Sequence, residues 1–314
     1  MQLKASLGSA ISRLAADGVP SPRLNAELLL MFALGCDRAY LFAHPERELT
    51  ADEHTRYEAS LAERSRGVPA QYITGHQEFW GMDLIVTPAV LIPRPETEHV
   101  IETVLQLQKA NAELKNADSL SQDWKMVPKP GKQERPPHTR FVDVGTGSGA
   151  IALALAKEFP DAEIYATDMS AAALEVARAN AARHQLEKRI EFHQADLLEG
   201  LALTDLDFVV SNPPYVGEGE EDQVQFEVRK FEPRDAVFGG RTGVEVIARL
   251  LPQAFAALRS GGWLVMEISG TIAGVVELLF STSQDAWDAV EIIPDLQSIP
   301  RVIRARKPKS RHGS

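Results

Sequence analysis

The sequence predicts an α/β fold in which a doubly wound, mostly parallel sheet follows a small helical domain and a β-hairpin. From residue 141 onward, short apolar runs alternate with helical segments, which is the pattern of a parallel sheet covered by helices. In the first seventy-odd residues the apolar side chains recur at helical spacing instead. We therefore divide the chain into a helical domain at 1–75, a hairpin and linker at 76–96, and an α/β domain at 97–314.

The helical domain carries its own start and stop signals. A helix is expected after Ser21-Pro22, ending at Gly35, and Thr50-Ala51-Asp52-Glu53 is a capping box that opens a further helix. Residues 1–90 contain 8 Lys and Arg against 11 Asp and Glu, a net charge of −3. Nucleic-acid binding needs clustered positive charge, so this domain is expected to contact a protein partner.

The linker is expected to begin with a hairpin that turns at Gly81, because apolar residues alternate with period two around it. The segment Ile92-Pro93-Arg94-Pro95-Glu96-Thr97-Glu98 is too rich in proline for a strand or a helix interior. A helix then runs towards residue 108, with acidic side chains in its first turn, where they suit the helix dipole. Residues 109–139 are rich in Lys, Asn, Gln and Pro and predict a flexible insertion.

Five strands and their intervening helices make up the expected α/β pattern. The strands are predicted at 141–144, 163–167, 190–194, 207–211 and 263–268, and the helices at 150–158, 171–183, about 243–258 and up to about 280. Two consecutive strands near 287–292 and 299–306 complete the sheet and predict one antiparallel edge.

A glycine turn follows the first strand of this domain, and acidic residues follow the next strands. Asp168 lies 23 residues after Gly145, where a carboxylate can accept bonds from a ribose diol. Gly145, Gly147 and Ala150 also satisfy a dinucleotide fingerprint, so this segment alone leaves an NAD enzyme open. Asp143 in the turn would repel a pyrophosphate but can face an amino group, and Asp196 can bind an adenine amine. Together these acids favour a cofactor without phosphates, and S-adenosylmethionine is of that kind.

Asn212-Pro213-Pro214-Tyr215 follows the fourth strand and is the second chemical motif. Its two prolines end the strand ladder and lock the backbone at the carboxyl end of the sheet, where such sheets bind ligands. The Asn212 Oδ1 atom and the Pro213 carbonyl can accept both hydrogens of a planar NH2 group. The nitrogen would then face a methyl donor, and Tyr215 is expected to pack against the flat amide.

Composition limits the alternatives. The net charge is −11, Cys36 is the only cysteine, and no apolar run approaches the length of a membrane span. The first ten residues lack the layout of a signal peptide, so a cytoplasmic protein is expected. No His and carboxylate spacing suggests a metal ligand set, and we predict no metal.

These motifs together resemble the peptide-chain release factor glutamine methyltransferases (the HemK/PrmC family). The specific signal is the combination of the glycine turn and Asn212-Pro213-Pro214-Tyr215 with the segment from Ile92 to Glu98. The resemblance implies a Rossmann-like class I S-adenosylmethionine-dependent methyltransferase sheet. It also implies methylation of the side-chain amide nitrogen of the glutamine in the Gly-Gly-Gln motif of class I release factors, in support of translation termination. S-adenosyl-L-homocysteine would be the product, and a monomer without direct nucleic-acid binding is expected.

The resemblance also assigns roles to residues of this chain. Substrate contacts are implied for Asn212, Pro213, Pro214 and Tyr215, while Arg94 and Glu96 are expected near the substrate entrance. Among these, Asn212, Pro213 and Tyr215 are the expected catalytic residues. With the acids named above, the cofactor contacts are expected from Asp143, Gly145, Thr146, Gly147, Ser148, Gly149, Asp168, Asp196, Leu197 and Asn212.

Two related activities and one departure from the family pattern remain open on the sequence. A ribosomal-protein glutamine methyltransferase shares the motif and fold but typically lacks the Pro-Glu-Thr-Glu run. A DNA adenine methyltransferase also uses such a motif, but it needs a basic surface that a net charge of −11 does not favour. Family members usually carry a glutamine where this chain has Glu267-Ile268-Ser269-Gly270-Thr271-Ile272.

Overall fold

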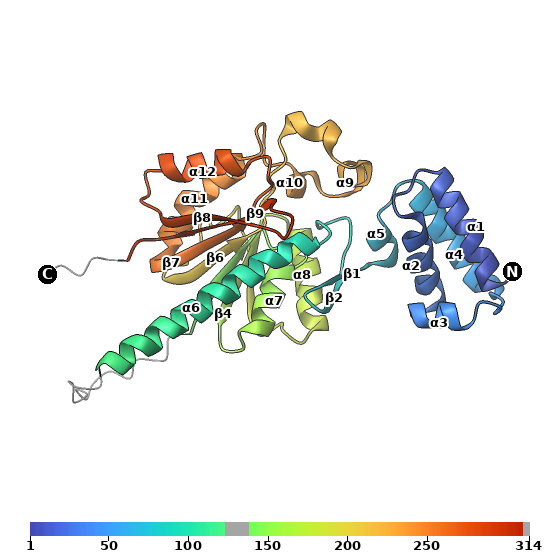
Figure 1. The fold of residues 1–314 in the computed structure, drawn as a ribbon, viewed down its shortest axis with the longest axis horizontal. Helices are drawn as coiled ribbons and strands as arrows, with labels where there is room; N and C mark the ends of the chain where they lie inside the picture. The colour runs from blue at the N-terminus through green and yellow to red at the C-terminus, as the bar shows by residue number, and fades with distance from the viewer. Residues whose placement is uncertain (123–137, 310–314) are drawn as a thin grey trace.

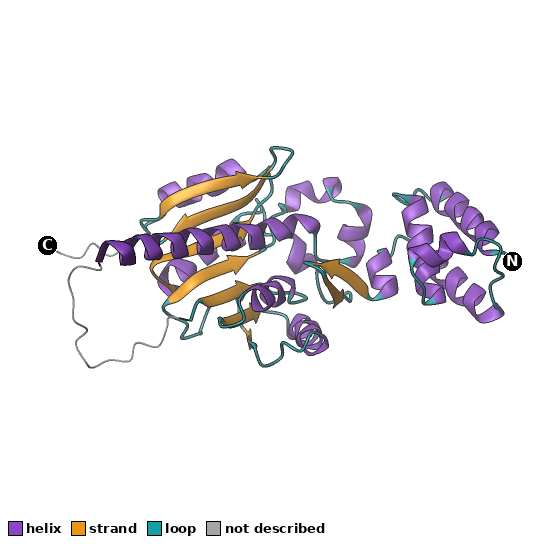
Figure 2. Ribbon diagram, turned by 60° about the horizontal axis from the view of Figure 1, so that its bottom comes forward, coloured by secondary structure: helices purple, strands orange, loops and turns teal. Residues whose placement is uncertain are grey.

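A computed structural model describes residues 1–122 and 138–309 (Figure 1). A helical bundle at the N-terminus leads through a two-stranded hairpin into a seven-stranded sheet with helices on both faces (Figures 1 and 2). This is the architecture that the sequence predicts. Within the described ranges, no helix is long and apolar enough to cross a membrane.

The N-terminal bundle packs around an apolar core that includes Leu14, Leu29 and Leu61. The capping box is confirmed, because Glu53 N donates to Thr50 Oγ1 at 3.2 Å and Thr50 N donates to a Glu53 carboxylate oxygen at 2.9 Å. The bundle consists of α1 (Leu3–Ala16), α2 (Pro22–Leu34), α3 (Arg38–Ala43), α4 (Ala51–Ser65) and α5 (Ala70–Thr74).

The hairpin pairs β1 (His76–Phe79) with β2 (Met82–Ile85). Trp80 and Gly81 form its turn with φ of 52° and 66°, so both lie in the left-handed region that a two-residue hairpin turn of type I′ requires. The sequence placed the turn at the glycine, and the structure agrees.

The large sheet has the strand order β5-β4-β3-β6-β7-β9-β8. Successive strands move outward from β3 to β5, and the chain then returns to place β6 on the other side of β3. This reversal creates a switch point at the carboxyl ends of β3 and β6, where open α/β sheets hold their ligands. The strands are β3 (Arg140–Val144), β4 (Glu163–Asp168), β5 (Ile190–Gln194), β6 (Leu206–Ser211), β7 (Leu258–Glu267), β8 (Asp288–Pro294) and β9 (Pro300–Arg306).

The antiparallel strand lies one position inside the edge. β9 runs antiparallel to both β7 and β8, and β8 forms the edge of the sheet. The sequence predicted the antiparallel pairing but did not distinguish which of the last two strands is outermost, because both are short and only partly apolar.

Alternate residues of the strands face two separate helix layers. Phe141 and Phe208 pack with α6 and α7 on one face, while Val142 and Val209 pack with α11 and α12 on the other. Figure 2 shows α6 running along its face of the sheet. The flanking helices are α6 (Glu98–Gln122), α7 (Ala150–Glu158), α8 (Ala171–Arg183), α11 (Glu245–Ala257) and α12 (Ala273–Thr282).

Helix α6 corrects the expectation for residues 109–139. The helix continues to Gln122, whereas the sequence predicted that it would end near residue 108. Residues 109–122 contain no proline and include several good helix formers, so their polar composition suits a solvated helix as well as a linker. The rest of the expected insertion, up to residue 137, lies outside the described residues.

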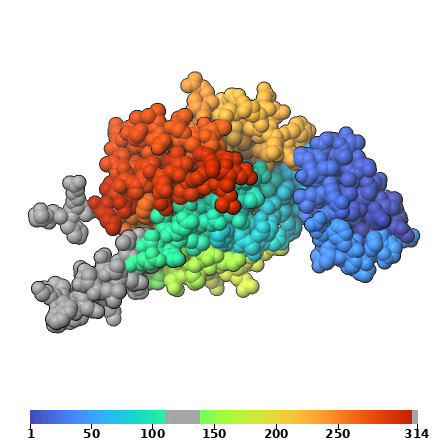
Figure 3. All heavy atoms as spheres, viewed as in Figure 1, coloured from blue at the N-terminus to red at the C-terminus, as the bar shows by residue number. Residues whose placement is uncertain are grey.

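The long loop after β6 is more structured than the sequence predicted. It contains η2 (Glu218–Gln223), α9 (Phe226–Phe231) and α10 (Arg234–Val237), and the earlier linker contains η1 (Pro95–Thr97). Arg64 of α4 forms an ion pair of 2.8 Å with Glu227 of α9, so this loop contacts the N-terminal bundle. Figure 3 shows the bundle in blue against the yellow-orange segment that includes α9.

Candidate active site

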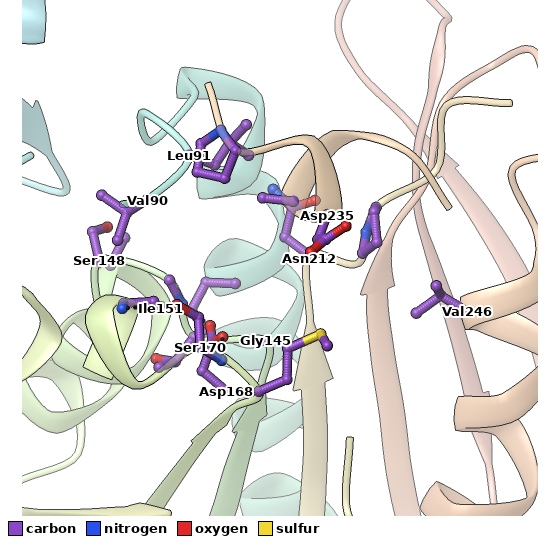
Figure 4. A pocket seen from close by; sticks show the side chains of 18 of the residues that line it. Val90, Leu91, Gly145, Ser148, Ile151, Asp168, Ser170, Asn212, Asp235 and Val246 are labelled. Carbon is purple, nitrogen blue, oxygen red and sulfur yellow. Dashed lines mark hydrogen bonds between the residues drawn. The ribbon is translucent and has the colours of Figure 1, made fainter. Parts of the chain in front are cut away.

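A pocket of about 280 Å³ opens at the carboxyl ends of β3, β4 and β6. The residues that Figure 4 labels surround one space and come from the glycine turn, the start of α7, the end of β4 and the turn after it, the linker before α6, the loop after β6, and α11. Of the residues expected to bind cofactor, the pocket is lined by Gly145, Thr146, Gly147, Ser148, Asp168, Asp196, Leu197 and Asn212.

The glycine turn is held against β4 by its own backbone. The N–H groups of Gly145 and Thr146 donate to the Thr167 carbonyl at 2.9 and 2.8 Å. Gly145 and Gly147 have φ of 73° and 55°, a conformation that glycine adopts without strain. Gly149 does not line the pocket. It begins α7, where an added Cβ would lie 3.3 Å from Ala177.

Asp143 is buried beneath the glycine turn and does not line the pocket. The geometry therefore does not support the expectation that it faces an amino group of the cofactor. Its Oδ2 atom accepts from Thr146 Oγ1 at 2.6 Å and from Ala152 N at 3.1 Å. Its Oδ1 atom is buried without a partner among the described residues. Burial raises the pKa of Asp143 to about 7, although both hydrogen bonds oppose the shift. This carboxylate therefore fixes the turn from beneath.

Three acidic residues line the pocket, namely Asp168, Asp196 and the exposed Asp235 of α10. Asp168 accepts from Gly147 N and from Ser170 N, each at 2.9 Å, and burial raises its pKa. Asp196 pairs with Arg249 of α11 at 2.5 Å. Arg249 lines the pocket but already has this carboxylate partner, so it is poorly placed to bind a phosphate.

Asn212 reaches the pocket together with Pro214, while Pro213 is buried behind them. The Asn212 Nδ2 atom donates to Thr97 Oγ1 at 3.0 Å, which leaves Oδ1 as the acceptor that no described residue uses. The expected contact of Asn212 Oδ1 with a substrate NH2 group stays a prediction.

Tyr215 does not line the pocket. Its ring packs against the core on the α11 and α12 face, and its hydroxyl donates to Glu267 Oε1 at 3.1 Å. Burial and the neighbouring Glu267 carboxylate raise the pKa of Tyr215. The expectation that Tyr215 stacks on a substrate amide is therefore corrected, because its hydroxyl is turned towards a buried carboxylate.

Arg94 and Glu96 also stand outside the pocket wall. Arg94 pairs with the buried Glu232 at 2.5 Å, and Glu232 accepts from Ile92 N at 3.1 Å. Glu96 is partly exposed and lies 4.0 Å from Arg301. These contacts fasten the linker to the loop after β6 and to β9, and the expected position of both residues near the substrate entrance stays a prediction.

Sequence reasoning missed two residues at this site. Thr97 lines the pocket, and Glu267, at the end of β7, is 2% exposed and bonds to Thr97 Oγ1 at 2.5 Å. Burial raises the pKa of Glu267 to about 7. Glu267 begins the stretch from Glu267 to Ile272, where family members usually carry a glutamine. Its hydrogen bond with Thr97 joins residues 170 positions apart, and no local sequence pattern indicates such a contact.

The donor set of the pocket fits a cofactor of the S-adenosylmethionine type. Three carboxylates line a mainly apolar pocket, and in the described chain Arg249 is the one basic residue that lines it. Carboxylates suit hydroxyl, amino and sulfonium groups and disfavour phosphates. No group of three or more His, Cys, Asp or Glu side chains within residues 1–122 and 138–309 is arranged to hold a metal.

Comparison with known proteins places both parts of the chain. The family described as the PrmC N-terminal domain matches residues 6–75, and the methyltransferase small domain matches residues 132–229. The release factor glutamine methyltransferase of Koribacter versatilis is 51% identical over 311 residues, covering 99% of this chain and 100% of the relative. That of Moorella thermoacetica is 40% identical over 295 residues, covering 94% of this chain and 95% of the relative.

A solved structure supports the fold alone. The catalytic domain of hMettl16, in complex with the MAT2A 3′UTR hairpin 6, is 16% identical, covers 83% of each chain and has a TM-score of 0.51. The matches to relatives along almost the whole chain establish the family, which this similarity of fold does not. With a methyltransferase sheet, a PrmC-type N-terminal domain and relatives that match along almost the whole length, this chain belongs to the release factor glutamine methyltransferase family.

Proposed function

We propose that this protein transfers a methyl group from S-adenosylmethionine to the side-chain amide nitrogen of a release factor glutamine, the one in the Gly-Gly-Gln motif. The observation that carries the proposal is the orientation of Asn212, whose Nδ2 donates to Thr97 at 3.0 Å and whose Oδ1 is left for a substrate at the pocket. Class I release factors are the proposed partners, and S-adenosyl-L-homocysteine is the proposed product.

The cofactor would lie between the glycine turn and the two acidic side chains. Asp168 would accept from ribose hydroxyls and Asp196 from the adenine amine, while the Gly145 to Ser148 turn lets the backbone approach closely. When bound, S-adenosylmethionine supplies an electrophilic methyl group.

The substrate amide must be oriented, because its nitrogen lone pair is delocalised into the carbonyl group. Asn212 Oδ1 and the Pro213 carbonyl would accept hydrogen bonds from the two N–H groups of the substrate amide. The remaining face of the amide nitrogen would then be directed towards the methyl group. Positioning of this kind can lower a barrier by about 7–11 kcal/mol. The new N–C bond would form as the S–C bond of the donor breaks. No base needs to act beforehand, since the amide proton becomes acidic as the new bond forms and would then be released to solvent.

Asn212→Ala tests the proposal. We expect loss of nearly all methyl transfer to a class I release factor, with binding of S-adenosylhomocysteine largely retained by calorimetry. Labelled methyl transfer should also be followed with a release factor in which the Gly-Gly-Gln glutamine is replaced by alanine, with ribosomal protein and with DNA. Label on DNA alone, undiminished label on the alanine release factor, or wild-type turnover by Asn212→Ala would refute the assignment.

A further inference from the structure

A chain of three side chains connects the buried carboxylate of Glu267 to Asn212. Asn212 Nδ2 donates to Thr97 Oγ1 at 3.0 Å, and Thr97 Oγ1 donates to Glu267 Oε2 at 2.5 Å. Thr97 is 4% exposed and Glu267 is 2% exposed, so water does not compete for these bonds. The other carboxylate oxygen accepts from the Tyr215 hydroxyl at 3.1 Å.

The direction of every bond in this chain follows from the charge of Glu267. An ionised carboxylate can only accept, so the Thr97 hydroxyl must give its hydrogen to Glu267. Thr97 then offers a lone pair to Asn212, and only the NH2 end of the Asn212 amide can use it. The Oδ1 end is therefore turned away from Thr97, free to accept.

We propose that Thr97 and Glu267 are positioning residues for methyl transfer, because they set the polarity of the Asn212 amide so that its oxygen meets the substrate NH2 group. This inference rests on the proposed function. It also gives the Pro-Arg-Pro-Glu-Thr-Glu segment a role at the reacting centre, through Thr97 of η1, whereas Arg94 and Glu96 do not line the pocket.

Protonation of Glu267 would reverse the direction of the hydrogen bonds that join it to Thr97 and Asn212. A protonated Glu267 can donate to Thr97, whose hydroxyl can then donate to Asn212 and attract the amide oxygen. The NH2 end of Asn212 would face the substrate NH2, and two donors cannot hydrogen-bond to each other.

The groups around Glu267 place this change near neutral pH. Burial raises the pKa of Glu267 to about 7, the negative charge of Glu96 raises it, and the bonds from Thr97 and Tyr215 and the charge of Arg301 lower it. Asp143, beneath the glycine turn, also has a pKa of about 7. Asp143 titrates in the wild type and in Glu267 variants alike. The difference between their pH profiles therefore reports the titration of Glu267 alone.

Four variants test the proposed positioning of Asn212 by Thr97 and Glu267. Each is assayed for kcat at saturating S-adenosylmethionine and saturating class I release factor. Glu267→Leu, which leaves the Thr97 hydroxyl without its acceptor, and the isosteric Thr97→Val should lower kcat about 10²-fold, the loss that a small misplacement of a reacting group causes. Thr97→Ser keeps the hydroxyl and should stay within about threefold of wild type. Glu277→Gln, on the exposed face of α12, is the matched control and should match wild type.

Binding and pH profiles separate positioning from damage to the fold. Each variant should bind S-adenosylhomocysteine within about threefold of wild type and melt cooperatively. Wild-type kcat should fall as the pH drops through about 7, and this fall should be smaller in Glu267→Gln, which lacks the carboxyl group at position 267. Tyr215→Phe removes a donor to the carboxylate, so the inflection should move to higher pH.

The outcomes are separable. Wild-type kcat in Glu267→Leu or Thr97→Val, or equal losses in Thr97→Ser and Thr97→Val, would overturn the positioning role of Thr97 and Glu267 while leaving the proposed function intact. An inflection near pH 7 that persists unchanged in Glu267→Gln would also overturn it. A wild-type enzyme that does not methylate the release factor glutamine would instead refute the proposed function.

Discussion

Asn180 offers the sharpest test of how the linker is joined to the glycine turn. This side chain of α8 is fully buried and makes three hydrogen bonds: it accepts from Ile85 N at 2.6 Å and donates to the carbonyls of Ile85 and Ser148, each at 2.9 Å. Asn180→Ala removes all three. At about 1 kcal/mol for each bond, and with a backbone N–H left without its partner, we expect a loss of about 3–4 kcal/mol in the free energy of unfolding.

Urea unfolding followed by tryptophan fluorescence measures this loss in the right domain, because all four tryptophans lie outside residues 1–75. Glu175→Ala, at an exposed position of the same helix, is the control and should change the free energy by less than about 0.5 kcal/mol. Binding of S-adenosylhomocysteine should also weaken in Asn180→Ala, since Ser148 belongs to the glycine turn. A destabilisation below about 1 kcal/mol, or one equal to that of the control, would refute the reasoning.

Two further predictions concern the partly buried Asp168 and the buried Asp143 and Glu267. Asp168→Asn should weaken S-adenosylhomocysteine binding about 10- to 100-fold by calorimetry, the cost of about 1.5–3 kcal/mol for a hydrogen bond to a charged group, and unchanged affinity would remove Asp168 from the cofactor site. Asp143 and Glu267 have folded-state pKa values of about 7 against ordinary values of 3.8 and 4.5, so the folded protein binds their protons more tightly than the unfolded chain. The free energy of unfolding should therefore rise as the pH falls from 8 to 5, and Glu267→Gln should reduce that rise. Equal pH dependence in wild type and variant would contradict the assignment.

Local signals in the sequence account for most of the fold. The strands of the sheet, the capping box at Thr50 and the hairpin turn at Gly81 each depend on neighbouring residues, whose periodicity or backbone preference is readable directly. The glycine turn and Asn212 follow strands, so their meeting at the carboxyl edge could also be anticipated.

Features that depend on distant contacts could not be anticipated. Whether Tyr215 faces a substrate or Glu267 is decided by the packing of a loop against β7, which no local pattern records. The extension of α6 to Gln122 was hidden because a solvated helix and a linker share the same polar residues. The partners of Thr97 lie 115 and 170 residues away in the chain.

Those separations have a consequence for the order in which the protein matures. A nascent chain that has emerged only as far as Tyr215 already contains the glycine turn and the Asn-Pro-Pro-Tyr motif, but not β7 or Glu267. Contacts between residues so far apart form late, because a long loop must close before they contribute. The glycine turn and Asn212 therefore precede Glu267 during synthesis, and the alignment of Asn212 waits until β7 has been made.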